Sequence, residues 1–114
     1  MSNNKDYFQK LLELMDILRG PDGCPWDKEQ TRESLKPMLV EETYEVLEAL
    51  GKDDSDELCE ELGDLLFQII FHSQISKEKR QFDIYDVCRR CYEKMVGRHP
   101  HVFGSTSYKD AGEL

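Results

Sequence analysis

Four acidic side chains occur as two pairs with the same spacing. Glu42 and Glu45 lie three residues apart in VEETYEVLEAL, and Glu61 and Asp64 lie three residues apart in EELGDLLFQIIFH. Residues at i and i+3 share one side of an α-helix, and here each pair borders an apolar stripe. Ionised carboxylates beside a core are costly without a positive partner. The pattern therefore favours a hard divalent cation such as Mg²⁺, which takes oxygen ligands.

The alternative is a solvated acidic rim on two surface helices. For either pair alone we expect such a rim about twice as often as a metal site, because carboxylates are mostly exposed. Two matched pairs, both next to core stripes, favour the metal site. Glu41 and Glu48 are expected to project further round the helix, toward solvent.

The elements that must position these acids are helices. Apolar residues recur with helical spacing, and no segment shows the alternation of a strand, so we expect an all-α fold in a four-helix bundle-like arrangement. The four helices are expected over about residues 5–19, from near Pro37 to Gly51, from an N-cap at Asp54 to about Lys79, and from an N-cap at Asp83 to Gly97.

Three segments between or beside these helices carry their own signals. Residues 20–30 hold two glycines and two prolines and are expected to form a loop. Pro37 indicates that residues 31–36 form a separate helical turn. His99 and His101 flank Pro100 and are expected to lie in an extended segment that docks the chain end on the bundle.

Composition narrows the classes of partner and location. The 114 residues carry a net charge of −9, which disfavours nucleic acid and anionic membranes as partners. We expect one domain over residues 1–114, with a core over about 5–104 and a tail over 105–114 that could begin a further helix.

The start of the chain has no apolar signal segment, and the apolar run from Leu65 to Phe71 is interrupted by Gln68 and too short to span a bilayer. We therefore expect a cytoplasmic protein with reduced thiols. Cys88 and Cys91 do not indicate zinc, since both are expected in the apolar stripe of the last helix and no second pair has ligand spacing.

The ordered motifs resemble those of MazG-type nucleoside triphosphate pyrophosphohydrolases. The resemblance rests on CPWDKEQT, then EExxE at residues 41–45, then ELGDLLFQ and RHPHVF, and it covers about residues 11–104. It implies an all-α enzyme that uses Mg²⁺ (or Mn²⁺) to cut a nucleoside triphosphate to the monophosphate and pyrophosphate. The general role that it implies is the cleaning of nucleotide pools. It is closest to the first of two tandem domains in longer relatives.

The resemblance also assigns roles to residues. Glu42, Glu45, Glu61 and Asp64 would be the metal ligands, in agreement with the spacing argument. Either Glu41 or Glu42 would take the proton from the attacking water. Lys94 and Arg98 match family positions that contact phosphates. Trp26 and Lys28 are further candidates for substrate contact because they lie in the loop over residues 20–30, not because the resemblance assigns them a role. Gly97 stands where many relatives carry another basic residue, which would weaken the phosphate grip.

Alternatives to these roles come from the residues themselves. Lys94 and Arg98 could pair with acids of a neighbouring helix, and Trp26 could cap the end of the bundle instead of stacking on a base. The whole domain could be a non-catalytic module for nucleotide sensing or dimerisation that retains the acidic site.

Assembly is indicated by the third helix. Residues 65–71 are apolar on several sides, and a bundle of this size covers only part of such a helix. We expect a homodimer or a dimer of dimers, which the family resemblance also implies.

Overall fold

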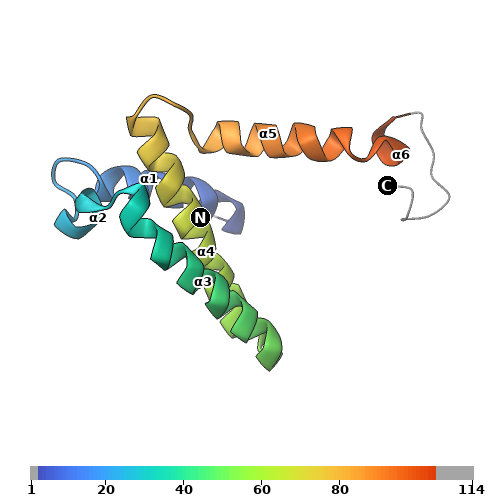
Figure 1. Ribbon diagram of the computed structural model, residues 1–114, viewed down its shortest axis with the longest axis horizontal. Coiled ribbons are helices and arrows are strands. Elements are labelled where there is room, and N and C mark those ends of the chain that lie inside the picture. Colours follow the sequence, from blue (N-terminus) through green and yellow to red (C-terminus); the bar gives the residue numbers. More distant parts are fainter. Residues whose placement is uncertain (1–2, 105–114) are drawn as a thin grey trace. The chain divides into compact units, whose positions relative to one another are not determined.

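A computed structural model of the chain describes residues 3–104. Within this range every regular element is a helix, so the expected all-α class is confirmed (Figure 1). The elements, in chain order, are a 3₁₀ turn η1 (Asn4–Asp6), α1 (Tyr7–Leu18), α2 (Pro25–Glu29), α3 (Arg32–Lys52), α4 (Ser55–Glu78), α5 (Ile84–Gly97) and α6 (Pro100–Phe103).

The described chain divides into two compact units between Gln81 and Phe82. The first contains α1 to α4, and the second contains α5 and α6. Among the described residues, no helix is long and apolar enough to cross a membrane. The expected tail at 105–114 lies outside the described residues, and the single-domain assignment stays a prediction.

The first unit is built on a long helical hairpin of α3 and α4. The two helices are joined by only Asp53 and Asp54, and so short a connection makes them antiparallel neighbours. Asp53 adopts the left-handed conformation (φ 55°) that ends α3. Asp54 caps α4, because its carboxylate accepts hydrogen bonds from the backbone N–H groups of Asp56 and Glu57.

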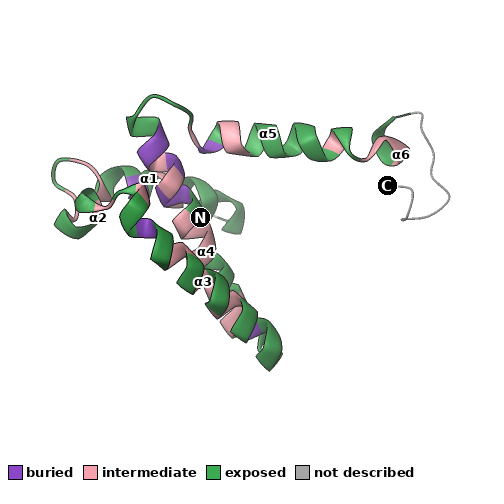
Figure 2. Cartoon of the chain, viewed as in Figure 1, coloured by how far each residue is buried: buried purple, intermediate pink, exposed green. Residues whose placement is uncertain are grey.

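The core of this unit lies at the end of the hairpin far from the Asp53 turn, where α1 packs on α4. Figure 2 shows most of the buried positions of this unit gathered there. The largest fully buried side chains are Met15 of α1, Leu35 of α3, and Phe71 and Ser76 of α4, and the smaller Ala49 is buried near the turn. This packing is the rigid base from which the hairpin extends.

Three sequence predictions about local structure were wrong. Pro37 does not separate a turn from α3, which is continuous from Arg32. The carbonyl group of Glu33 loses its usual donor at Pro37, but both residues are exposed, so water can replace that bond. The expected loop over residues 20–30 contains α2, which starts at Pro25, a favoured first residue of a helix. The segment around His99 and His101 is the short helix α6, which also starts at a proline.

The second unit begins with a well-defined helix start. The side chain of Asp83 accepts a hydrogen bond from the N–H of Asp86, and the side chain of Asp86 accepts one from the N–H of Asp83. This reciprocal capping confirms the N-cap expected at Asp83. Cys88 and Cys91, expected in the apolar stripe of this helix, are both exposed.

Candidate metal and nucleotide site

The hairpin turn sets the register of the acidic pairs. Glu42 and Asp64 are each eleven residues from Asp53, and Glu45 and Glu61 are each eight residues from it. In an antiparallel helix pair with a short turn, residues equally far from the turn lie at the same level. At about 1.5 Å per residue, both pairs stand about 12 to 17 Å along the hairpin from the turn.

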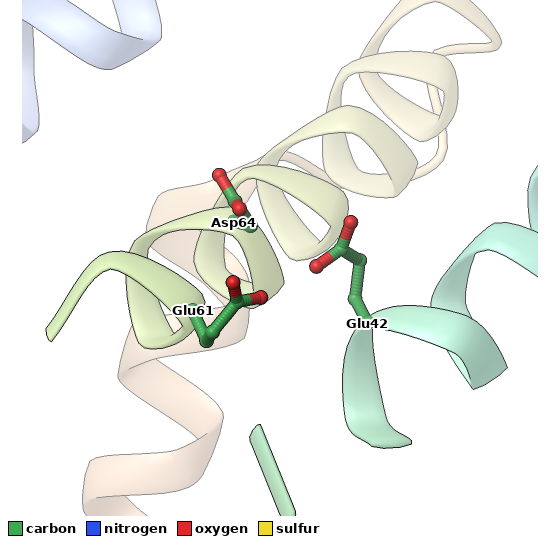
Figure 3. Close-up of side chains that lie close together, drawn as sticks. All are labelled: Glu42, Glu61 and Asp64. Atoms are coloured by element: carbon green, nitrogen blue, oxygen red, sulfur yellow. The ribbon is translucent and has the colours of Figure 1, made fainter. Parts of the chain in front are cut away.

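Three of these carboxylates meet between the two helices. Glu42 projects from α3, while Glu61 and Asp64 project from α4 (Figure 3). One oxygen atom of each lies within 4.8 Å of an oxygen atom of each of the others. Glu42 and Glu61 are partly buried, and Asp64 is exposed. The cluster is therefore open to solvent on the Asp64 side.

The cluster is electrostatically strained. Burial raises the pKa of Glu42, and the negative charges of Asp64, Glu45 and Glu41 raise it further. Burial likewise raises the pKa of Glu61, with added repulsion from Asp64, Glu45 and Glu42. Both shifts arise from burial and from neighbouring negative charges, which disfavour the ionised carboxylates.

The remaining acids of the motif lie around this group. Glu45 is not one of the three meeting carboxylates, but it is partly buried and close enough for its charge to raise the pKa values of Glu42 and Glu61. Glu41 is exposed, as expected from its position on the helix. The structure thus brings together three of the four expected metal ligands and places the fourth beside them.

The donor set fits a hard divalent cation. The Oε2 atom of Glu42 is shielded from solvent and has no hydrogen-bond partner within the described residues. An unpartnered buried carboxylate oxygen is unusual and indicates an absent ion or water. Two helices that each place carboxylate oxygens at one point provide the hard ligands that Mg²⁺ or Mn²⁺ requires.

The second unit carries the expected phosphate-binding residues. Lys94 and Arg98 are separated by one helical turn at the end of α5, where the backbone N–H of Arg98 donates to the carbonyl oxygen of Lys94. Both side chains are exposed. They form a pair of cations on one side of that helix.

The segment before α3 holds the other two expected substrate contacts. Trp26, on α2, is 53% exposed, so within the described structure it does not act as a buried lid. The ammonium group of Lys28 donates a hydrogen bond to the carbonyl oxygen of Pro21 at 2.8 Å. Lys28 thus closes the loop before α2.

Arg19 fixes this segment to the core end of the hairpin. Its guanidinium donates to both carboxylate oxygens of Glu78, at 2.7 and 2.8 Å, and to the carbonyl oxygens of Asp27 and Gln30, at 2.6 and 3.2 Å. The same group lies over the ring of Phe71, 5.5 Å from its centroid. One side chain therefore connects the end of α1, the end of α4 and α2.

Comparison with known proteins places this geometry in a family. Residues 30–103 match the family described as the MazG nucleotide pyrophosphohydrolase domain. This chain belongs to that family. The match begins just before α3 and extends to the end of α6, so it contains the whole acidic hairpin and the Lys94–Arg98 pair.

Named relatives and a solved structure agree with the MazG assignment. The chain is 51% identical over 105 residues to the nucleoside triphosphate pyrophosphohydrolase/pyrophosphatase MazG of Thermotoga maritima, and 48% identical over 106 residues to the nucleoside triphosphate pyrophosphohydrolase of Escherichia coli strain K12. These alignments cover 90% and 92% of this chain but only 41% and 40% of the relatives. The chain therefore spans about two fifths of their length. A crystal structure of a MazG-related protein from Thermotoga maritima matches with a TM-score of 0.74 and 28% identity, covering 92% of this chain and 90% of that one.

Two features of this MazG domain were missed by sequence reasoning. Nothing in the sequence near Arg19 identifies Glu78, 59 residues away, as its partner. Gln68 stands out in the sequence only as an interruption of the apolar run of α4. Its Oε1 atom is buried without a partner within the described residues, and a polar residue inside an apolar run was the signal that could have found it.

Proposed function

We propose that this MazG domain is a Mg²⁺-dependent nucleoside triphosphate pyrophosphohydrolase, which converts a (d)NTP to the (d)NMP and pyrophosphate. The observation that carries the proposal is the meeting of Glu42, Glu61 and Asp64 between α3 and α4, with a buried Glu42 oxygen that has no hydrogen-bond partner within the described residues. The names of the relatives support the reaction class. Removal of non-standard nucleotides from the cellular pool is the role we propose for it.

Glu42, Glu61 and Asp64, with Glu45 beside them, would hold Mg²⁺, and Mn²⁺ offers the same coordination chemistry. When bound, such an ion supplies charge to offset the triphosphate and lowers the pKa of a coordinated water. The raised pKa values of Glu42 and Glu61 mean that protons compete with the metal for these carboxylates as the pH falls.

The other residues would bind and orient the reactants. Glu42, or the exposed Glu41 beside it, would accept the proton of the water that attacks the α-phosphorus. Lys94 and Arg98 would hold the phosphate oxygens that gain charge as pyrophosphate leaves. Trp26 is exposed enough to stack on a base. Lys28 retains two N–H donors beyond its bond to Pro21 and could offer them to the substrate.

The direct test is release of pyrophosphate from individual nucleoside triphosphates in the presence of Mg²⁺. We expect turnover by the wild type and its loss in Glu61→Gln. Glu48→Gln is the matched control, because Glu48 is an exposed acid of α3 outside the cluster. Nucleotide binding without turnover in the wild type would refute the enzyme and favour the sensing module. Absence of both nucleotide and metal binding would refute the site.

We also propose that the domain works as a homodimer or a dimer of dimers. Four large apolar residues of α3 that recur at helical spacing are each more than half exposed: Val40, Tyr44, Leu47 and Leu50. They lie away from the α4-facing side that carries Glu42, and an apolar stripe of this length is typical of an interface. A second copy would present the same stripe, as a two-fold interface requires.

Light scattering at micromolar concentration tests this assembly. We expect at least twice the 13.4 kDa mass of the chain, and dissociation in Leu47→Glu. A monodisperse, active species of monomer mass would overturn the proposal. It would imply that the stripe is covered within the chain.

A further inference from the structure

Gln68 of α4 is only partly buried as a residue, but its side-chain oxygen is buried. Its Oε1 atom is shielded from solvent and accepts no hydrogen bond within the described residues. A buried carbonyl oxygen without a donor is destabilising, so it calls for a partner that the described residues do not supply. The apolar residues on either side, Phe67 and Ile69, do not provide one.

The position of Gln68 directs it toward the acidic cluster. It follows Asp64 by one helical turn and Glu61 by two, so all three share one side of α4. Side chains on an α-helix lean toward its N-terminus. The amide of Gln68 therefore leans over the turn that carries Asp64, about 6 Å along the helix axis.

One oxygen of the acidic cluster and the oxygen of Gln68 both lack a donor within the described residues. Glu42 Oε2 and Gln68 Oε1 are both buried acceptors without donors within the described residues. Two acceptors cannot satisfy one another. A cation held by the carboxylates would be a partner for Glu42 Oε2, and a water bound to that cation would be a donor for Gln68 Oε1, because Mg²⁺ keeps several of its waters.

His72 provides a natural comparison on the same helix. Its Nε2 atom is also buried without a hydrogen bond within the described residues. It lies two turns beyond Asp64, about 12 Å along the axis, at the end of α4 that approaches Arg32. Burial lowers the pKa of His72, and the positive charge of Arg32 lowers it further. The His72 side chain therefore lies near Arg32.

We propose that Gln68 is a positioning residue whose Oε1 atom accepts a hydrogen bond from a water on the metal held by Glu42, Glu61 and Asp64. The inference rests on the metal site of the proposed function and adds an amide to it from outside the acidic motif. Groups that hold ligands in place around a metal affect its affinity by about 10- to 100-fold. Gln68 would fix the direction of that water and so the face on which the substrate approaches.

The experiment measures Mn²⁺ affinity by electron paramagnetic resonance of the free ion, together with urea unfolding in EDTA. Gln68→Leu should bind Mn²⁺ about 10-fold more weakly than the wild type. In EDTA it should be at least as stable, because an unpartnered amide has been replaced by an apolar group of similar size. Gln68→Glu, which keeps an oxygen at the same place, should retain Mn²⁺ binding. His72→Leu, the control, should remove a buried unpartnered nitrogen without changing Mn²⁺ affinity.

The outcomes separate the inference from the function on which it rests. Wild-type affinity in Gln68→Leu would overturn the inference while leaving the metal site in place. Equal losses in Gln68→Leu and His72→Leu would also overturn it, since the effect would then come from packing. If the wild type itself binds no Mn²⁺, or if Glu61→Gln binds it unchanged, the metal site fails and the inference fails with it.

Discussion

Replacement of Arg19 by methionine should destabilise the first unit more than the loss of an ordinary surface charge. The side chain of Arg19 is only 10% exposed, and its four hydrogen bonds join α1, α2 and α4. Methionine keeps the flexible stem that packs near Phe71 but removes every donor. The substitution therefore removes the hydrogen bonds while keeping most of the packing contacts of the side chain.

The magnitude follows from the partners that lose a donor. Glu78 is 38% exposed, so water would partly solvate its carboxylate, and this ion pair contributes about 1 kcal/mol. The carbonyl groups of Asp27 and Gln30 would each lose a charged donor, at about 1 kcal/mol each. The sum is about 3 kcal/mol. For a chain of this length it corresponds to a fall in Tm of roughly 12 °C.

Urea and thermal unfolding monitored by circular dichroism provide the assay, with Glu78→Gln as a partner variant. Glu78→Gln should cost about 1 kcal/mol, and its effect should vanish in the Arg19→Met background, because the interaction is then already absent. Lys77→Ala is the control, since Lys77 forms an exposed pair with Asp16 at 3.4 Å. If Arg19→Met costs no more than Lys77→Ala, Arg19 does not hold the three helices together and the reasoning is wrong.

Three other perturbations have directions that the structure determines. In EDTA, the protein should gain stability as the pH falls from neutral toward the ordinary glutamate pKa of about 4.3. The reason is that the raised pKa of Glu42 makes the folded state bind a proton at a higher pH than the unfolded state does. Glu42→Gln should reduce this gain in stability, and an unchanged pH profile in that variant would contradict the assignment. Below that pH the lowered pKa of Glu78 acts in the opposite sense, and its stabilising contribution is lost. Gly23→Ala should destabilise by about 1 to 3 kcal/mol, because its Cβ atom would lie 2.1 Å from the carbonyl oxygen of Leu18; unfolding at the wild-type urea midpoint would refute this. Lys94→Ala and Arg98→Ala should raise KM for the nucleotide and leave Mn²⁺ binding intact, whereas Arg89→Ala, which removes the partner of Asp86 and Glu93 on the same helix, should leave KM unchanged.

Local signals predicted the helices because those signals act over a few residues. The caps at Asp54 and Asp83 determine where α4 and α5 begin, and an acidic residue followed by another acid three positions later predicts both of them. The errors arose at prolines, because a proline can start a helix or lie within one as well as interrupt it. At Pro25 and Pro100 it starts a short helix, and at Pro37 it is tolerated within a long one because the carbonyl group left without a donor faces water.

The acidic site was predictable for a similar reason. Glu42, Glu45, Glu61 and Asp64 are arranged symmetrically about Asp53, so two helices and a short turn are enough to bring the pairs to one level of the hairpin. Which three carboxylates meet, and why Glu45 lies beside them instead, depends on how each helix is rotated about its own axis when the two pack together. That rotation is a result of packing, which helical periodicity does not give.

The sequence by itself determined the helical class, the starts of α4 and α5 and the side of each helix that carries the acids, because all of these follow from interactions within one or two turns. Only the tertiary structure decided that Arg19 joins Glu78 across 59 residues, and that one oxygen each of Glu42 and Gln68 is buried without a partner among residues 3–104. Contacts of that kind depend on the docking of α1 onto α4 and of α3 onto α4. No local pattern records them, because burial is a property of the assembled helices rather than of any single segment.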